Sequence, residues 1–177
     1  VPLLSRRTIK KLKEQTLDND LVVLTGEVKK PFGYGRIVKD SEGKPMAIIE
    51  ELDCDETQRE IKEINSGIMA FKTNVVKNLV ESIKPNPKKN EYYLTDAIEI
   101  AYHEGLRTVS YRTTEEEVFG VNSKKDLAEA EKINRIKIAD ELMALAQVAV
   151  AKVEQDGQAK MYFTASAAVV DVQRIDS

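Results

Sequence analysis

Leu21-Val22-Val23-Leu24 is a short, unbroken apolar run that follows the polar segment Asp18-Asn19-Asp20. A run of this length and composition is typical of a strand that is buried on both faces of a sheet. The segment before it, from Ser5 to about Leu17, carries Ile9 and Leu12 at helical spacing and has Ser5 as its expected N-cap. A helix that leads into a doubly buried strand favours the α/β class.

The alternation of helices and strands continues along the chain. The sequence predicts further strands at residues 36–39, 46–50, 64–71 and 106–111. It predicts further helices at residues 55–62, 74–83, 93–103 and 123–145. A turn at residues 40–43 makes the first two of these strands an antiparallel hairpin. We therefore expect an α/β fold with a mostly parallel sheet and a small antiparallel extension.

The last part of the sequence changes character, and we divide the chain into residues 1–143 and a tail of residues 144–177. The tail is rich in Ala and Val, and residues 147–153 and 161–172 are expected to form strands, with a turn at residues 155–157. The sequence contains neither an internal repeat nor a low-complexity linker. At the other end, Val1-Pro2-Leu3-Leu4 reads as the end of a strand, so we expect a truncation there.

The composition excludes several classes of protein. A formal net charge of −3 gives no broad attraction to nucleic acids or anionic lipids, and no apolar run is long enough to cross a membrane. The single cysteine, Cys54, rules out an internal disulfide and makes a reducing cytoplasm the default location. One cysteine and one histidine, His103, cannot form a Cys/His zinc site, so any metal must be held by oxygen ligands.

Two clusters near the predicted hairpin combine glycines with carboxylates. Gly33-Tyr34-Gly35-Arg36 is either an ordinary glycine turn or a place where the backbone approaches a ligand closely. Glu50 and Glu51 close a strand, where most carboxylates are solvated. A carboxylate that lies over a cleft can instead accept hydrogen bonds from sugar hydroxyls, so both alternatives stay open for each cluster.

Three further segments place polar side chains at the ends of predicted elements. Asn65, at the head of an apolar strand, is either a turn residue or an amide directed at a ligand. Thr95 is expected as a first-turn helix residue, whereas Glu91 before it can present a carboxylate to a sugar. Asn122 or Ser123 is the expected N-cap of the long helix. An Asn at such a strand-to-helix junction can also be an oxygen ligand for Mg²⁺.

Two reactive residue types are not expected to act in catalysis. His103 is predicted near the end of a helix beside Glu104, where we interpret it as a surface or capping residue. Cys54 lies among acidic residues, which should raise the pKa of its thiol and leave it unreactive.

Six short motifs follow one another between Val1 and Ser123: Val-Pro-Leu-Leu, Gly-Tyr-Gly-Arg-Ile, Ile-Ile-Glu-Glu, Glu-Ile-Asn-Ser-Gly-Ile, Glu-Tyr-Tyr-Leu-Thr-Asp and Gly-Val-Asn-Ser. In this order they resemble the uridyltransferase domain of the bacterial bifunctional family that combines N-acetylglucosamine-1-phosphate uridyltransferase with glucosamine-1-phosphate acetyltransferase. The resemblance reaches about Met143 and corresponds to the C-terminal part of that domain. It implies a partial Rossmann-like nucleotidyltransferase domain over residues 1–143.

The resemblance also implies an activity and a set of site residues. UMP would be transferred from UTP to N-acetylglucosamine 1-phosphate, which gives UDP-N-acetylglucosamine for peptidoglycan and cell-wall synthesis and releases pyrophosphate. Gly35, Glu50 and Asn65 would contact the sugar, and Asn122 would bind Mg²⁺ and touch the sugar nucleotide. No covalent catalyst is implied, because positioning and charge neutralisation drive such transfers. We expect Asn65 and Asn122 in one cleft at the carboxyl ends of strands.

Several features of the resembled family would lie outside this sequence. The glycine-rich loop that cradles the UTP phosphates, and an Asp that is the second Mg²⁺ ligand, would both precede Val1. We therefore expect an incomplete nucleotide site and an inactive isolated chain. Residues 144–177 would be a degenerate start of the left-handed β-helix through which the family trimerises. They show no hexapeptide period, so acetyltransferase activity is not expected and homo-oligomerisation is left open.

Two alternatives to this uridyltransferase stay open on the sequence alone. The first is a related nucleotidyltransferase that acts on another sugar 1-phosphate, such as glucose 1-phosphate. The second is a noncatalytic module that binds a sugar phosphate or assembles with another polypeptide, as one half of a split enzyme.

Overall fold

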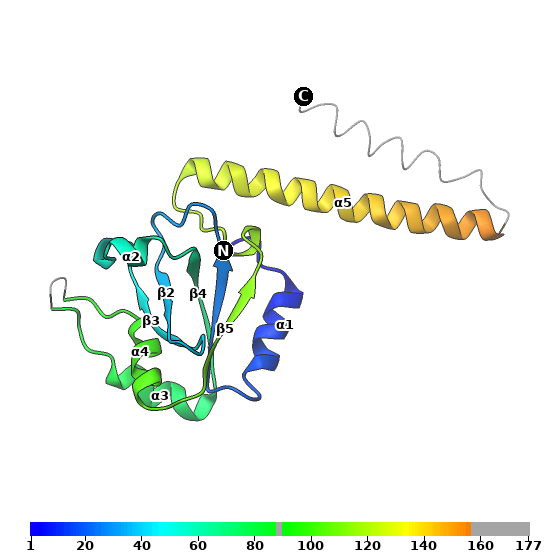
Figure 1. The fold of residues 1–177 in the computed structure, drawn as a ribbon. Coiled ribbons are helices and arrows are strands. Elements are labelled where there is room, and N and C mark those ends of the chain that lie inside the picture. The colour runs from blue at the N-terminus through cyan, green and yellow to red at the C-terminus, as the bar shows by residue number, and fades with distance from the viewer. Residues whose placement is uncertain (88–89, 157–177) are drawn as a thin grey trace. The chain divides into compact units, whose positions relative to one another are not determined.

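The structure, a computed structural model, describes residues 1–87 and 90–156 (Figure 1). The chain divides into two compact units, one from Val1 to Val121 and one that begins at Asn122. The first unit contains the sheet and the shorter helices, and the second contains the long helix.

The first unit is built on one five-stranded sheet. Its strands are β1 (Leu21–Glu27), β2 (Arg36–Lys39), β3 (Pro45–Ile49), β4 (Glu63–Phe71) and β5 (Thr108–Thr113), in the order β3-β2-β4-β1-β5. β1 runs parallel to β5, while the pairs β1/β4, β2/β4 and β2/β3 are antiparallel. The predicted α/β class is confirmed, and the sheet is mixed. Within the described residues, β1 and β5 are the only strands that pair in parallel. More of the strand pairs are therefore antiparallel than the sequence predicts.

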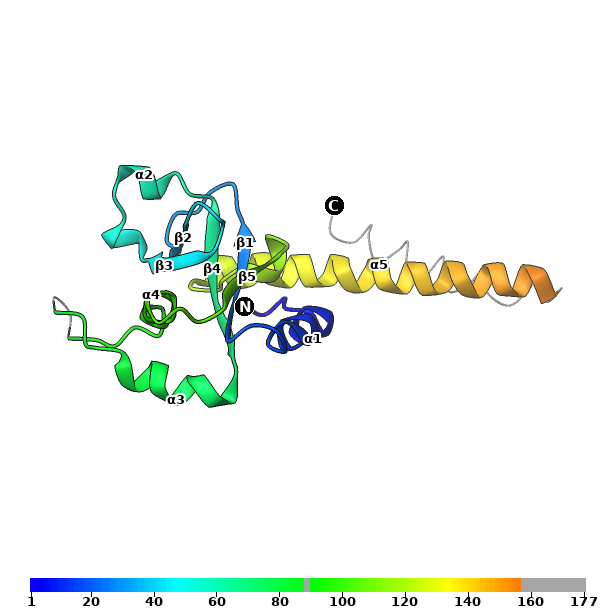
Figure 2. The same cartoon turned by 60° about the horizontal axis from the view of Figure 1, so that its bottom comes forward.

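Helices cover both faces of this sheet. The first unit contains α1 (Arg6–Gln15), α2 (Glu56–Arg59), α3 (Thr73–Ser82) and α4 (Asp96–His103), with the 3₁₀ turns η1 (Glu51–Asp53) and η2 (Glu116–Val118). α1 lies on one side of the sheet, and α3 and α4 lie on the other (Figures 1 and 2). α2 is one turn long, which is shorter than the helix predicted for residues 55–62, and its Asp55 N-cap forms a capping box with Gln58.

The predicted buried strand lies at the centre of two apolar clusters. The side chains of Leu21 and Val23 pack with Leu79 of α3 and Ile98 of α4. Those of Val22 and Leu24 point to the opposite face, because successive side chains of a strand alternate. Leu12 of α1 joins this second cluster. The prediction that β1 is buried on both faces is therefore confirmed.

The buried stripe of α1 is narrower than the sequence predicts. Ser5 caps the helix by accepting a hydrogen bond from the Thr8 N–H, as expected. Thr8 and Leu12 are buried, and their spacing of four residues puts them on one side of the helix. Ile9 is 52% exposed, so the expectation that it packs in the core is wrong. It lies one residue beyond the stripe that Thr8 and Leu12 define.

β4 contains an irregularity next to Asn65. Val23 of β1 pairs with Met69, and Thr25 pairs with Asn65, so the residue between them on β1 faces three residues on β4. Gly67 lies within this bulge and has a φ of 81°, a conformation that favours glycine. The Ser66 hydroxyl fixes the bulge by donating a hydrogen bond of 2.7 Å to the Leu24 carbonyl. Bulges of this kind redirect the neighbouring side chains of a strand.

β4 is paired unevenly on its two sides. Its one registered partner on β2 is Arg36, which pairs with Ile64. Among the described residues, Met69, Ala70 and Phe71 pair with β1 and with no strand on the other side. Their side chains are half-buried, although the strand stands third in the order of five.

The second unit is dominated by α5 (Lys124–Asp156). Ser123 accepts a hydrogen bond from the Asp126 N–H at 3.1 Å, and Asp126 accepts one from the Asn122 N–H at 3.1 Å. This reciprocal arrangement confirms the predicted helix start. The strand predicted for residues 147–153 is wrong, since α5 continues through them; Ala and Gln are good helix formers, and an existing helix propagates readily. The strand predicted for residues 161–172 lies outside the described residues, as does Gly157 of the predicted turn.

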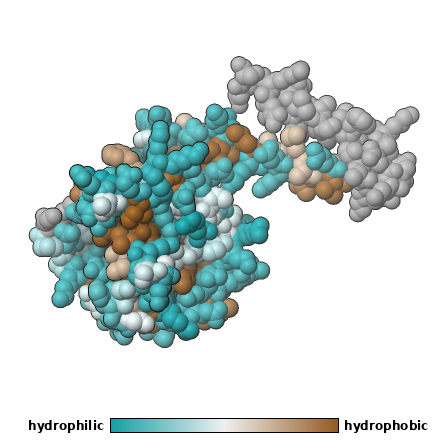
Figure 3. Space-filling view, viewed as in Figure 1, coloured by the Kyte–Doolittle hydropathy of each residue, from teal (hydrophilic) through white to brown (hydrophobic). Residues whose placement is uncertain are grey.

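α5 carries exposed apolar side chains over much of its length, and hydrophobic patches interrupt its hydrophilic surface (Figure 3). The exposed apolar side chains of α5 include Leu127, Ile136, Ile138, Leu142, Leu145 and Val148. Among residues 1–87 and 90–156, no helix combines the length and the apolar character that a membrane span requires.

Candidate functional site

Gly35 lies where three segments of the first unit meet. A Cβ atom on Gly35 would lie 2.8 Å from Cγ2 of Ile48 and 3.4 and 3.5 Å from the two carboxylate oxygens of Glu50. Such spacing leaves room for glycine alone unless Ile48 moves. The group that Gly35 approaches in the structure is the end of β3, so the predicted close approach of its backbone to a ligand stays a prediction. The left-handed φ of this loop belongs to Gly33, at 84°.

Asn65 meets the same glycine from the other side. Its N–H donates a hydrogen bond of 2.8 Å to the Gly35 carbonyl. Its side-chain oxygen accepts a hydrogen bond of 3.0 Å from the Gly67 N–H and so stabilises the bulge in β4. The structure thus brings Gly35, Glu50 and Asn65 together around one point, although they come from a loop, the end of β3 and the start of β4.

Thr95 is a further residue beside this group. Its hydroxyl donates a hydrogen bond of 3.4 Å to Oε1 of Glu50, and it occupies the N-cap position of α4 without capping the helix through its side chain. From the sequence alone, Thr95 is expected only as a first-turn helix residue. Glu91, the other candidate of that segment, is exposed and accepts a hydrogen bond of 2.8 Å from the Tyr93 hydroxyl.

An ion pair between a buried guanidinium and a half-buried carboxylate holds the loop that carries Gly35. The Arg36 side chain is 2% exposed, and its Nη2 donates to Oε2 of Glu51 at 2.7 Å. The same oxygen accepts a hydrogen bond of 3.0 Å from the Gly33 N–H, while Nη1 of Arg36 donates to the Tyr34 carbonyl. Hydrogen bonding from Arg36 lowers the pKa of Glu51, against the opposing effect of burial. The expectation of a solvated carboxylate is wrong for Glu51, because it faces this guanidinium.

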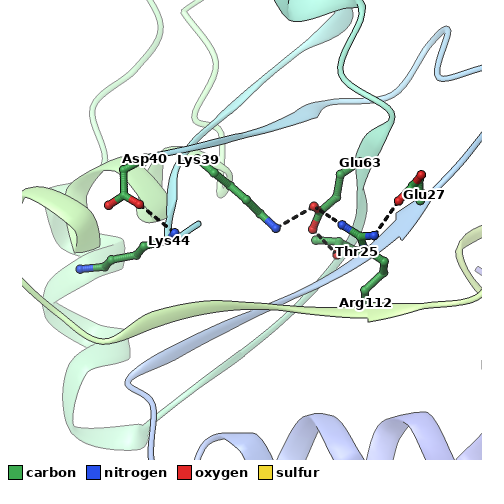
Figure 4. A network of polar contacts seen from close by, with 7 residues as sticks. All are labelled: Thr25, Glu27, Lys39, Asp40, Lys44, Glu63 and Arg112. Atoms are coloured by element: carbon green, nitrogen blue, oxygen red, sulfur yellow. Dashed lines mark hydrogen bonds and ion pairs between the residues drawn. The ribbon is translucent and has the colours of Figure 1, made fainter. Parts of the chain in front are cut away.

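A second polar network fixes the start of β4, two residues before Asn65 (Figure 4). The Glu63 carboxylate is almost fully buried and accepts hydrogen bonds from Thr25 at 2.8 Å, Lys39 at 2.7 Å and Arg112 at 3.0 Å. Arg112 also pairs with Glu27 at 2.6 Å. Burial disfavours the charged form of Glu63, but hydrogen bonds from Lys39 and Thr25 outweigh it and lower the pKa.

Asn122 opens the second unit, so its position beside Asn65 in one cleft stays a prediction. It offers one neutral oxygen ligand, whereas Mg²⁺ usually binds one or two carboxylates together with substrate phosphates. Among the described residues no group of three or more His, Cys, Asp or Glu could hold a metal ion. The role of Asn122 as a Mg²⁺ ligand stays a prediction.

His103 lies at the surface, as predicted, and Cys54 lies in the interior. His103 is the last residue of α4, is largely exposed and lies 3.9 Å from the Glu99 carboxylate. Cys54 is buried, and its thiol donates to the Ile49 carbonyl at 3.6 Å. Burial is the main cause that raises the pKa of this thiol, and the acidic neighbours Glu51 and Asp55 add to it.

A separate hollow lies at the far end of the sheet. It is lined by the turn before β3 and the start of β5, including Lys44, Pro45, Arg107 and Thr108. Thr108 pairs with Leu21 at the first residue of β1, whereas the Gly35 group lies near Thr25 at the other end of that strand. The candidate site therefore rests on the chemistry around Gly35 and not on this hollow.

Sequence comparison with known proteins also points to the bifunctional relatives suggested by the motifs. No family model matches the chain. The bifunctional protein GlmU of Paraburkholderia phymatum is 40% identical over 144 residues, which are 81% of this chain and 32% of that protein. GlmU of Francisella tularensis subsp. novicida is 40% identical over 145 residues, with the same two coverages. The chain spans about a third of the length of these curated relatives. Over the matched four-fifths of its length, the chain is similar in sequence to part of GlmU.

Proposed function

We propose that this chain provides the sugar-phosphate side of a uridyltransferase site. The reaction is attack by a phosphate oxygen of N-acetylglucosamine 1-phosphate on the α-phosphorus of UTP. The new P–O bond forms as the bond to the leaving pyrophosphate breaks, and UDP-N-acetylglucosamine is the product. One observation carries the proposal: Gly35 accepts a hydrogen bond from the Asn65 N–H and lies so near Glu50 that an added Cβ would meet its carboxylate at 3.4 Å. The family resemblance assigns both of these residues to the sugar.

The chemistry around Gly35 suits a sugar ligand. The Glu50 carboxylate is half-buried at the end of β3 and can accept hydrogen bonds from sugar hydroxyls. Thr95 adds a hydroxyl beside it, and the Asn65 amide can both donate and accept. Because these groups are held by strands and by a bulge, their geometry is set before the ligand arrives, which lowers the entropy cost of binding. The proposal that the reaction requires Mg²⁺ rests on the family resemblance, which assigns Asn122 as a ligand of this ion.

The first test is binding of N-acetylglucosamine 1-phosphate to the 177-residue chain, measured by isothermal titration calorimetry. Glu50→Gln removes one charged acceptor while keeping the side-chain volume. Loss of such a bond is worth about 1.5–3 kcal/mol, so affinity should fall roughly ten- to a hundredfold. Glu42→Gln is the matched control, since Glu42 is exposed in the turn before β3. Unchanged affinity in Glu50→Gln would contradict the assignment of this residue to the sugar.

The second test is pyrophosphate release from UTP and N-acetylglucosamine 1-phosphate. The chain alone is expected to show no turnover, because none of the residues proposed above for the site would hold the UTP phosphates. Adding a polypeptide that carries that loop should give Mg²⁺-dependent pyrophosphate release. Glucose 1-phosphate as the acceptor tests the sugar specificity. Robust turnover by the chain alone would show that the nucleotide site is misplaced.

A further inference from the structure

The loop that carries Gly35 is pinned at every residue from Tyr34 to Arg36. The Tyr34 N–H donates to the Pro31 carbonyl at 3.2 Å, and the Tyr34 hydroxyl accepts from the Gly120 N–H at 3.2 Å. The Arg36 guanidinium uses Nη1 for the Tyr34 carbonyl and Nη2 for Glu51. Glu51 in turn accepts from the Gly33 N–H. The Arg36–Glu51 ion pair therefore forms hydrogen bonds to the loop backbone at both Gly33 and Tyr34.

The Arg36–Glu51 ion pair has features that stability alone does not explain. Burying an ion pair costs desolvation that the mutual attraction often fails to exceed, and apolar pairs of similar volume can replace it without loss. Arg36 is also the largest of the fully buried side chains, and its Nε has no hydrogen-bond partner among the described residues. An unpaired buried donor destabilises the fold further. What the pair does supply is orientation, because a planar guanidinium directs two donors at fixed angles.

We propose that Arg36 and Glu51 are positioning residues of the sugar-phosphate site. Their ion pair holds residues 33–35 so that Gly35 stays against Glu50 and Asn65. This inference rests on the function proposed above, since it assigns the pair a purpose at that site. Glu50 and Glu51 thus have different tasks: Glu50 faces the site with Thr95, and Glu51 faces inward and supports the loop.

Two conservative variants of the full chain test the pair. Glu51→Gln keeps the shape and one acceptor but removes the charge that faces Arg36. Arg36→Lys keeps the charge, but a single ammonium group cannot reproduce the two fixed donor directions. Affinity for N-acetylglucosamine 1-phosphate should fall about tenfold in each, the change expected when one charge-assisted hydrogen bond is lost. In ¹H–¹⁵N spectra the amide signals of Gly33 and Gly35 should shift, while signals from α3 and β5 stay in place.

Lys72→Met is the matched control. Lys72 pairs with Asp20 at 3.2 Å, and the two side chains are 25% and 17% exposed. This ion pair follows the last residue of β4 and precedes β1, at the opposite end of these strands from Asn65. The control variant should unfold at a lower temperature but bind the sugar phosphate with unchanged affinity. A merely structural role for Arg36 and Glu51 would give the same pattern.

The outcomes separate the two proposals. If the unaltered chain binds and Glu50→Gln weakens binding, but Glu51→Gln leaves affinity and the Gly35 signal unchanged, the positioning role is overturned and the sugar site stands. If the unaltered chain does not bind N-acetylglucosamine 1-phosphate at all, both are overturned. If Arg36→Lys fails to fold, Glu51→Gln alone decides, because Gln is close in volume to Glu. Weaker binding together with shifted Gly33 and Gly35 signals supports the proposal.

Discussion

One added methyl group at Gly35 should damage both the fold and the candidate site. In Gly35→Ala the new Cβ would lie 2.8 Å from Cγ2 of Ile48, closer than side chains normally approach. Ile48 is 7% exposed in the core of β3 and cannot turn into solvent. The strand end or the loop must therefore shift, and Glu50, whose oxygens would lie 3.4 and 3.5 Å from the same Cβ, shifts with it.

The size of the effect follows from this geometry. Overpacking of a buried position by one methyl group costs about 1–3 kcal/mol of unfolding free energy. For a chain of this size each kcal/mol lowers the melting temperature by roughly 2–4 °C. No conformational strain adds to this figure, because the Gly35 φ is not in the left-handed region. Affinity for N-acetylglucosamine 1-phosphate should fall as well, since Glu50 is displaced.

A double-mutant cycle isolates the contact. Ile48→Leu removes the β-branch methyl group, and by itself it should cost less than about 1.5 kcal/mol. Gly35→Ala should then cost less in the Ile48→Leu background than in the unaltered chain. Urea unfolding followed by circular dichroism suits the measurement, because the chain has no tryptophan. An equal cost in both backgrounds, or no cost in either, would refute the close contact between Gly35 and Ile48.

Three further outcomes are expected. The pKa of Glu63 is lowered in the folded state, so its stabilising contribution is present above the pKa of the unfolded chain and is lost as pH falls through the folded-state value. Glu63→Gln should therefore flatten the decline of unfolding free energy below about pH 5 in urea titrations at several pH values, and an unchanged slope would contradict this. Leu12→Ala should lower the unfolding free energy by about 2–5 kcal/mol in the same assay, whereas Ile9→Ala should change it little, because Ile9 is exposed. The buried, protonated Cys54 thiol should react with a disulfide reagent only after unfolding, and fast reaction in the folded chain would show that it is accessible.

Local patterns predicted most elements of the first unit. The continuous apolar run of β1 can be recognised because a strand with both faces buried has no polar alternation. The hairpin of β2 and β3 follows from turn residues between two short apolar runs. The cap at Ser5 follows from the hydroxyl that precedes the first helical turn. Each of these signals lies within a few neighbouring residues.

Features that depend on distant parts of the chain were not predictable in this way. The antiparallel pairing of β4 with β1 joins residues some forty positions apart, as Thr25 with Asn65 shows, and no local pattern specifies its direction. The bulge at Gly67 follows from that pairing. The Arg36–Glu51 ion pair was also missed, because its partners lie fifteen positions apart and no local pattern joins them. For residues 147–153, Ala and Val alone do not distinguish a strand from a helix.

The contact of Gly35 with Glu50 and Asn65 is an intermediate case. The motifs singled out all three residues, but only the fold shows that they meet at one point. The supporting residues around them, Arg36 and Thr95, became visible only with the structure.

Because the end of β4 pairs on one side only within the described residues, backbone groups with and without a strand partner alternate along it. In an antiparallel ladder successive residues direct their N–H and C=O groups alternately toward and away from the partner strand. Along Met69, Ala70 and Phe71 the groups directed at β1 are bonded, and those directed away meet no other strand among the described residues. The stretch contains neither a proline nor a charge, which are the usual means of blocking such an edge. Slow and fast amide hydrogen exchange should therefore alternate residue by residue along this segment, and the fast positions would become slow if another strand paired there.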